Sequence, residues 1–124
     1  LIGDGSFNYD PAPAAFGAAQ EHGLPFLTIM FNNSGYLSQK SGIPKYYPGG
    51  WAVKSGNFSG LHIKPAPEYS LMIKAWDGYG EKVEEPSEVR KAVERGLRAV
   101  AGGQSALLDI RLRTVEDTVE RGEG

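Results

Sequence analysis

The sequence Phe26-Leu27-Thr28-Ile29-Met30-Phe31, followed by Asn32-Asn33-Ser34-Gly35, decides the fold class. A short apolar run of this kind is typical of a strand that is buried on both faces, as in a parallel sheet. The Asn, Ser and Gly residues that follow are strong turn formers and are expected to end the strand. The segment therefore predicts an α/β protein, in which helices must cover both faces of the sheet.

Toward the amino terminus, the sequence predicts the end of a second strand and then a helix. Residues 1–2 are apolar and stand directly before the glycine-rich residues 3–6, so they resemble the end of a buried strand whose beginning is missing. Residues 3–6 are expected to form a turn. Asp10 and Pro11 supply an N-cap and a first-turn proline for a helix over residues 12–21, which a glycine ends.

Toward the carboxyl terminus, helical and strand patterns alternate after a long irregular stretch. The expected elements are a loop or lid over residues 35–66 with one helical turn near 36–40, a helix over 69–76, a strand over 80–83, a helix over 86–100, a strand over 106–110 and a charged, frayed tail over 114–124. This alternation favours a parallel sheet joined by crossover helices. We expect residues 1–113 to form one domain that lacks its first elements, as part of a longer protein.

Composition excludes several classes of function. The chain has 124 residues and a net charge of −2, so it has no overall basic field with which to bind nucleic acid. It has no cysteine, which excludes disulfides, thiolate metal sites and cysteine nucleophiles. Its apolar runs are too short to cross a bilayer. A protein with these properties, and with no sign of a signal peptide, is expected to be cytoplasmic.

Two polar residues follow neighbouring strands. Asp4 comes just after the first strand and Asn33 just after the next, with one helix between them. Because ligands of open α/β sheets bind at the carboxyl ends of the strands, we expect both side chains at one edge. Carboxylate and amide oxygens suit Mg²⁺. The amides of Gly3, Gly5 and Ser6, near the positive end of the following helix, suit an anion, so the sequence predicts a diphosphate bound through a metal ion.

The same residues carry a resemblance to a known family. The motif Gly3-Asp4-Gly5-Ser6, followed by the 25 residues from Phe7 to Phe31 and then by Asn32-Asn33, resembles the GDG...NN signature of thiamine diphosphate-dependent enzymes. The match extends through Phe7-Asn8-Tyr9 after the first motif and Ser34-Gly35-Tyr36 after the second. The chain is similar to the cofactor-diphosphate (PP) domain of the acetolactate synthase, benzoylformate decarboxylase and 2-oxo acid decarboxylase group. The resemblance implies that Asp4 and Asn33 bind Mg²⁺ through their side chains and Gly35 through its carbonyl. It also implies a set of cofactor-binding residues: Gly3, Asp4, Gly5, Ser6, Asn33, Gly35 and Tyr36.

The resemblance carries further expectations about activity and assembly. It implies an enzyme that decarboxylates or ligates 2-oxo acids, as a homodimer or homotetramer. The catalytic glutamate would come from a pyrimidine-binding domain of the same or another chain, so this fragment alone would be inactive. Ser34-Gly35-Tyr36 is closer to benzoylformate decarboxylase than to acetolactate synthase. A 2-hydroxyacyl-CoA lyase or oxalyl-CoA decarboxylase, a non-catalytic cofactor-binding or assembly module, and a Mg²⁺-dependent phosphate-transfer domain are the alternatives.

Charge is unevenly distributed along the chain. Residues 22–67 contain no acidic residue and four lysines, so this segment has a charge of +4, whereas the rest has a charge of −6. The lysines are Lys40, Lys45, Lys54 and Lys64. Five aromatic residues are interleaved with them. The simpler interpretation is a solvated loop; the sharper one is a lid that attracts an anionic substrate, either a 2-oxo acid or an acyl-CoA.

Overall fold

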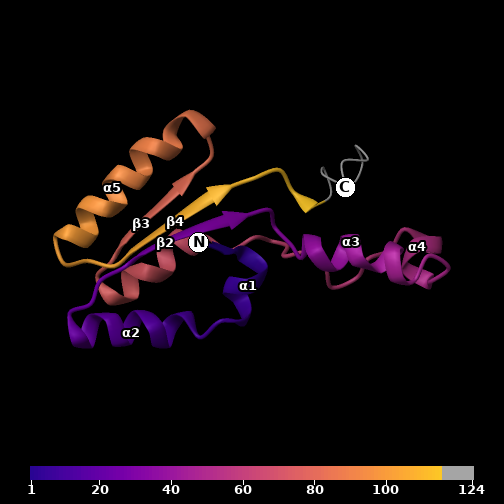
Figure 1. Cartoon of the computed structure of the whole chain (residues 1–124), viewed down its shortest axis with the longest axis horizontal. Helices are drawn as coiled ribbons and strands as arrows, with labels where there is room; N and C mark the ends of the chain where they lie inside the picture. The colour runs from indigo at the N-terminus through magenta and orange to yellow at the C-terminus, as the bar shows by residue number, and fades with distance from the viewer. Residues whose placement is uncertain (116–124) are drawn as a thin grey trace.

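The computed structural model describes residues 1–115, and its centre is a four-stranded parallel sheet (Figure 1). All strand pairs are parallel, and the order across the sheet is β1-β2-β4-β3. The strands are β1 (Ile2–Gly3), β2 (Leu27–Asn32), β3 (Tyr79–Val83) and β4 (Ala106–Arg111). In the central pair, Met30 lies opposite Asp109 and Asn32 opposite Arg111. The predicted parallel sheet is confirmed.

Helices cover both faces of this sheet. They are α1 (Asp4–Tyr9), α2 (Ala12–His22), α3 (Leu37–Tyr46), α4 (Trp51–Ser55), the 3₁₀ helices η1 (Tyr69–Trp76) and η2 (Pro86–Glu88), and α5 (Val89–Ala101). In Figure 1, α2 lies on one side of the sheet and α5 on the other. No helix within residues 1–115 is both long and apolar enough to cross a bilayer.

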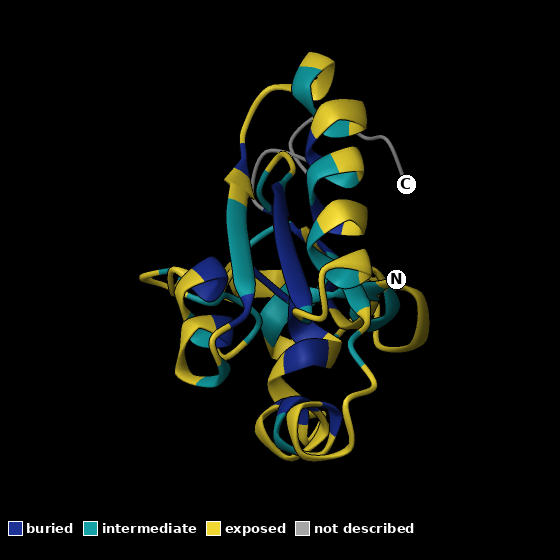
Figure 2. Ribbon diagram, turned by 90° about the vertical axis from the view of Figure 1, so that its left-hand side faces the viewer, coloured by how far each residue is buried: buried dark blue, intermediate teal, exposed yellow. Residues whose placement is uncertain are grey.

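Alternate residues of β4 point into two separate hydrophobic cores. Leu107 packs with Phe16 and Tyr69 beneath α2 and η1, whereas Leu108 packs with Ala92 beneath α5. Burial of a leucine side chain stabilises a fold by about 1.5–3 kcal/mol. The strand therefore needs apolar residues on both faces, and Figure 2 shows it as buried along its length. Burial on both faces explains why the apolar pattern of this strand is nearly continuous in the sequence.

The amino-terminal segment differs from the prediction. Residues 3–6 do not form a turn, because α1 begins at Asp4. Burial of Phe7, which packs against Tyr69 with ring centroids 5.6 Å apart, outweighs the low helix propensity of the glycine-rich segment. Asp10 is not a side-chain cap of α2; it ends α1 instead, donating its backbone N–H to the Ser6 carbonyl oxygen at 3.0 Å.

The segment predicted to be irregular, residues 35–66, contains two helices that cover about half of it. Residues 37–46 and 51–55 form α3 and α4, which extend from the sheet edge away from the strands (Figure 1). Gly42 and Pro44 lower the helix propensity of α3 and made it hard to predict. Residues 69–76 are helical as predicted, although as a 3₁₀ helix.

The predicted frayed tail is wrong at its start. Val115 is fully buried, because its side chain packs over Gly35 and its backbone is hydrogen bonded to Asn33. The remainder of that prediction, residues 116–124, lies outside the described residues.

Candidate functional site

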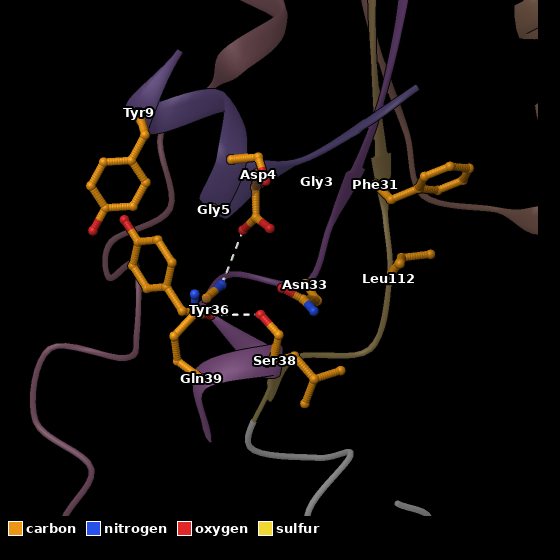
Figure 3. Close-up of a pocket in the computed structure, with 13 residues that line it drawn as sticks. Gly3, Asp4, Gly5, Tyr9, Phe31, Asn33, Tyr36, Ser38, Gln39 and Leu112 are labelled. Atoms are coloured by element: carbon orange, nitrogen blue, oxygen red, sulfur yellow. Dashed lines mark hydrogen bonds between the residues drawn. The ribbon is translucent and has the colours of Figure 1, made fainter. Parts of the chain in front are cut away.

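A pocket of about 280 Å³ lies at the carboxyl edge of the sheet (Figure 3). Its walls come from the end of β1, the beginning of α1, the turn after β2 and the first turn of α3. All seven residues predicted to bind the cofactor line it: Gly3, Asp4, Gly5, Ser6, Asn33, Gly35 and Tyr36. The topology therefore brings together two sequence segments that the chain separates by a whole helix and strand.

Asp4 connects the two segments directly. Its side chain is 2% exposed, and its Oδ2 accepts a hydrogen bond of 3.0 Å from the backbone N–H of Gly35. Figure 3 shows the carboxylate pointing from α1 toward the turn that holds Asn33. The predicted proximity of Asp4 and Asn33 at one sheet edge is thus present in the structure.

Asn33 lines the same pocket and carries a buried side-chain oxygen. Its Oδ1 is shielded from solvent and has no hydrogen-bond partner among residues 1–115. Buried polar atoms are nearly always paired, so an unpaired one at a pocket indicates a ligand. An amide oxygen, the Asp4 carboxylate and a backbone carbonyl form the oxygen-rich donor set that Mg²⁺ prefers. The described residues contain no group of three His, Cys, Asp or Glu side chains for a metal, and this donor set needs none.

Glycines allow the backbones around the pocket to approach each other. A Cβ atom on Gly5 would lie 2.7 Å from Cδ1 of Tyr36 and 3.4 Å from the Gly35 carbonyl oxygen. The Tyr36 ring packs against Tyr9, with centroids 5.7 Å apart (Figure 3). Gly5 therefore places the first turn of α1 against the turn after β2, where a larger residue would displace the Tyr36 ring.

The turn after β2 is held by hydrogen bonds from two distant segments. Leu112 donates its backbone N–H to the Asn32 carbonyl at 2.8 Å, and Val115 donates to the Asn33 carbonyl at 2.9 Å. From the other side, residues 61–63 exchange backbone hydrogen bonds with Ser34 and Tyr36, both at 3.0 Å. Because its carbonyls and amides are engaged on both sides, the turn has a fixed shape before any ligand binds.

A chain of buried polar side chains lies behind the turn, and it was not predicted from the sequence. Asn32 is 1% exposed; its Nδ2 donates to Oδ1 of Asp109 at 2.9 Å, and its Oδ1 accepts from the Ser34 N–H at 3.0 Å. Arg111 forms an ion pair with Asp109, with Nη2 2.7 Å from Oδ2 but outside hydrogen-bond geometry. Desolvation raises the pKa of Asp109, opposed by the hydrogen bond from Asn32 and the charge of Arg111. An acidic residue in an otherwise apolar strand was the available signal.

The helix that begins at the pocket differs from the predicted one. The prediction placed the positive end of the helix over residues 12–21 near the anion. Instead α1 begins at the pocket with Asp4, and no residue of α2 beyond it lines the pocket. The reason is the early helical start at Asp4, which inserts an additional short helix between β1 and α2.

Comparison with known proteins identifies the family. The model of the thiamine pyrophosphate enzyme C-terminal TPP-binding domain matches residues 1–110. The chain belongs to this family. Its pocket is therefore part of a domain type that binds thiamine diphosphate (TPP), which is the same compound as thiamine pyrophosphate. The resemblance found in the sequence is confirmed at this level.

Two curated proteins are similar to this chain at modest sequence identity. A probable acetolactate synthase of Mycobacterium bovis and the acetolactate synthase large subunit IlvG of Mycobacterium tuberculosis are each 26% identical over 110 residues. These matches cover 89% of this chain and 18% of each relative. The chain thus spans about a fifth of the length of the relatives it matches, and it corresponds to one domain of an acetolactate synthase-like enzyme family.

Proposed function

We propose that the pocket binds the diphosphate end of TPP through Mg²⁺, in an enzyme that decarboxylates or ligates 2-oxo acids. The observation that carries this proposal is that the unpaired, buried Oδ1 of Asn33 and the buried carboxylate of Asp4 belong to residues that line one pocket. Both atoms are hard oxygen donors in a pocket that belongs to a TPP-binding domain. When bound, TPP supplies a nucleophilic carbon and an electron sink for loss of CO₂.

Each part of the pocket has a distinct role in this proposal. Asp4 and Asn33 hold the metal ion by their side chains, and Gly35 holds it by its carbonyl. Gly5 and Ser6 contact the diphosphate at the start of α1, where backbone N–H groups lack intrahelical partners. Mg²⁺ commonly keeps substrate phosphate and water among its ligands, which suits a site with only three protein donors. The domain therefore anchors and orients the cofactor.

The remainder of the active site is proposed to lie outside this chain. TPP enzymes of this group use a glutamate from a pyrimidine-binding domain, which we place in the same or another subunit of a homodimer or homotetramer. The substrate is a 2-oxo acid such as pyruvate or benzoylformate. A full-length protein assayed with these two acids and with a 2-hydroxyacyl-CoA distinguishes decarboxylase, ligase and CoA lyase.

Binding is tested with an Asn33→Ala variant of the full-length protein. Because Oδ1 of Asn33 has no partner within residues 1–115, its removal should leave folding nearly unchanged. Loss of even an outer-shell group costs about 10–100-fold in metal affinity, so we expect at least about a tenfold higher Mg²⁺ concentration for half-maximal TPP binding by calorimetry. An Asp4→Asn variant should show the same direction.

The matched control is Asn57→Ala, at an exposed asparagine that does not line the pocket. It should bind TPP as the unmodified protein does. Chelation of divalent ions should abolish TPP binding in the unmodified protein. Binding that survives chelation, or an Asn33→Ala variant with unchanged Mg²⁺ dependence, would contradict the proposed metal site.

A further inference from the structure

The buried chain behind the pocket has a role that the proposed metal donors do not include. Asp109 is 0% exposed in the middle of β4, where every other residue from Ala106 to Ile110 is apolar and buried. A carboxylate at such a position is costly unless it is paired. Its partners are Asn32 on one side and Arg111 on the other. The position therefore serves a purpose other than hydrophobic packing.

Asn32 connects Asp109 to the turn through two side-chain hydrogen bonds. With Nδ2 fixed by Asp109, the Oδ1 of Asn32 accepts the Ser34 N–H, closing a local turn around Asn33. Ser34 has a φ of 59°, in the left-handed region that a serine adopts only at a cost. The side chain of Asn32 thus offsets this cost. Without an acceptor in β4, its Nδ2 would lose the hydrogen bond that fixes its orientation.

Arg111 secures the other end of the chain. Its Nη2 donates to the Pro67 carbonyl at 3.1 Å and lies 3.7 Å from a carboxylate oxygen of Glu68. The polar chain therefore extends from the segment before η1, through β4, to the turn after β2. Each link is a direct contact in the structure, and the central members, Asn32 and Asp109, are both buried.

We propose that Asp109 is a positioning residue, which holds the Asn32–Ser34 turn so that Asn33 faces the divalent ion. This inference rests on the proposed function for its ligand, because the ion is the one that Asp4 and Asn33 would share. Asp109 itself does not line the pocket and does not touch the ion. Its effect is exerted through Asn32.

The test separates the hydrogen bond from the ion pair with three variants of the full-length protein. Arg111→Met removes the cation and its hydrogen bond to the Pro67 carbonyl, and it keeps the Asp109 acceptor for Asn32. Asp109→Leu with Arg111→Met also removes the acceptor, without leaving a buried charge unpaired. Asp109→Asn with Arg111→Met keeps an acceptor oxygen for Asn32 and serves as the conservative rescue. The readout is the Mg²⁺ concentration for half-maximal TPP binding, measured by calorimetry.

We expect the Asp109→Leu double variant to need about tenfold more Mg²⁺ than Arg111→Met, which corresponds to about 1.4 kcal/mol. Asp109→Asn with Arg111→Met should remain within about twofold of Arg111→Met, because Asn32 keeps an acceptor. Hydrogen exchange of the Ser34 amide, followed without metal or TPP, should accelerate in the Asp109→Leu double variant only. An Arg95→Met variant, which breaks a partly buried, hydrogen-bonded ion pair with Glu81, provides a control for general destabilisation. It should lower the melting temperature without changing the Mg²⁺ requirement.

Equal Mg²⁺ requirements for the Asp109→Leu and Asp109→Asn double variants would overturn the positioning role. So would faster Ser34 exchange with an unchanged Mg²⁺ requirement, because the turn would then not set the metal geometry. Absence of TPP binding in the unmodified protein would contradict the proposed function instead. In that case the Ser34 exchange measurement still tests the link from Asp109 to the turn.

Discussion

Substitution of Gly35 by alanine should damage both stability and cofactor binding. The added Cβ would lie 2.5 Å from the Leu61 carbonyl oxygen and 2.8 Å from Cγ2 of Val115. Ordinary carbon–oxygen contacts are about 3.3–3.6 Å, so the overlap with the oxygen is close to 1 Å. The Leu61 carbonyl cannot move away easily, because it accepts the Tyr36 N–H at 3.0 Å.

The expected cost follows from this overlap. Overpacking of a well-packed site costs about 1–3 kcal/mol, and a cost of about 2 kcal/mol lowers the melting temperature of a domain of this size by roughly 6–10 °C. Thermal unfolding followed by circular dichroism measures this change. Calorimetry should also show weaker Mg²⁺-dependent TPP binding, because the Gly35 carbonyl moves with the turn.

Gly42→Ala is the matched control for this prediction. In α3 the new Cβ would meet only the Tyr46 ring, at 3.9 Å, and alanine is favoured over glycine in a helix by about 0.5–1 kcal/mol. The control should therefore be as stable as the unmodified protein or more stable. A Gly35→Ala protein that melts within about 1 °C of the unmodified protein would refute the steric argument.

Two further predictions concern charge. Arg95 lowers the pKa of Glu81 chiefly through its hydrogen bonds, so this pair stabilises the fold above the ordinary Glu pKa of 4.5, and the contribution disappears as the pH falls through the lowered pKa. Urea unfolding should show Glu81→Gln less stable than the unmodified protein at pH 7 and the difference shrinking at acidic pH; a difference independent of pH would contradict this linkage. If the basic segment attracts an anionic substrate, exchanging Lys45 and Lys54 for Glu should raise KM for 2-oxo acids, most at low salt; an unchanged KM at low salt would exclude this role.

The fold was predictable from the sequence wherever burial decides the structure. The apolar runs at 26–31 and 106–110 identified the two central strands, because β4 is buried on both faces and most residues of β2 are at least partly buried, although Phe31 is exposed. The amphipathic pattern after Pro86 identified α5 for a similar reason. The hydrophobic pattern of each of these elements extends over its whole length. A single exception such as Asp109 therefore did not obscure it.

Elements that depend on tertiary contacts were not predictable. Helix α3 contains both Gly42 and Pro44, and it is supported by packing of Lys40, whose Nζ lies 5.7 Å from the Phe58 ring centroid and 3.4 Å from the Val115 carbonyl oxygen. Nothing near α3 in the sequence shows that such partners exist. Helix α1 is similar, because its glycine indicates a turn until the burial of Phe7 is known.

The sequence was sufficient to predict where the proposed donors lie, but not the contacts that support them. Asp4 and Asn33 follow strand ends, and strand order places them at one edge. The link from Asn32 to Asp109 joins two strands that are far apart in the sequence, and register alone determines it. Identification of such supporting contacts requires coordinates.

The backbone contacts of Leu112 and Val115 with the Asn32–Asn33 turn have a consequence for the order of folding. A nascent chain that has emerged only as far as β4 already contains every proposed donor to the ion, yet it lacks the two N–H groups that close the turn from that side. Contacts between remote parts of a chain form late, since their loop-closure entropy must be offset first. The shape of this turn is therefore completed only after residues 112–115 have been synthesised.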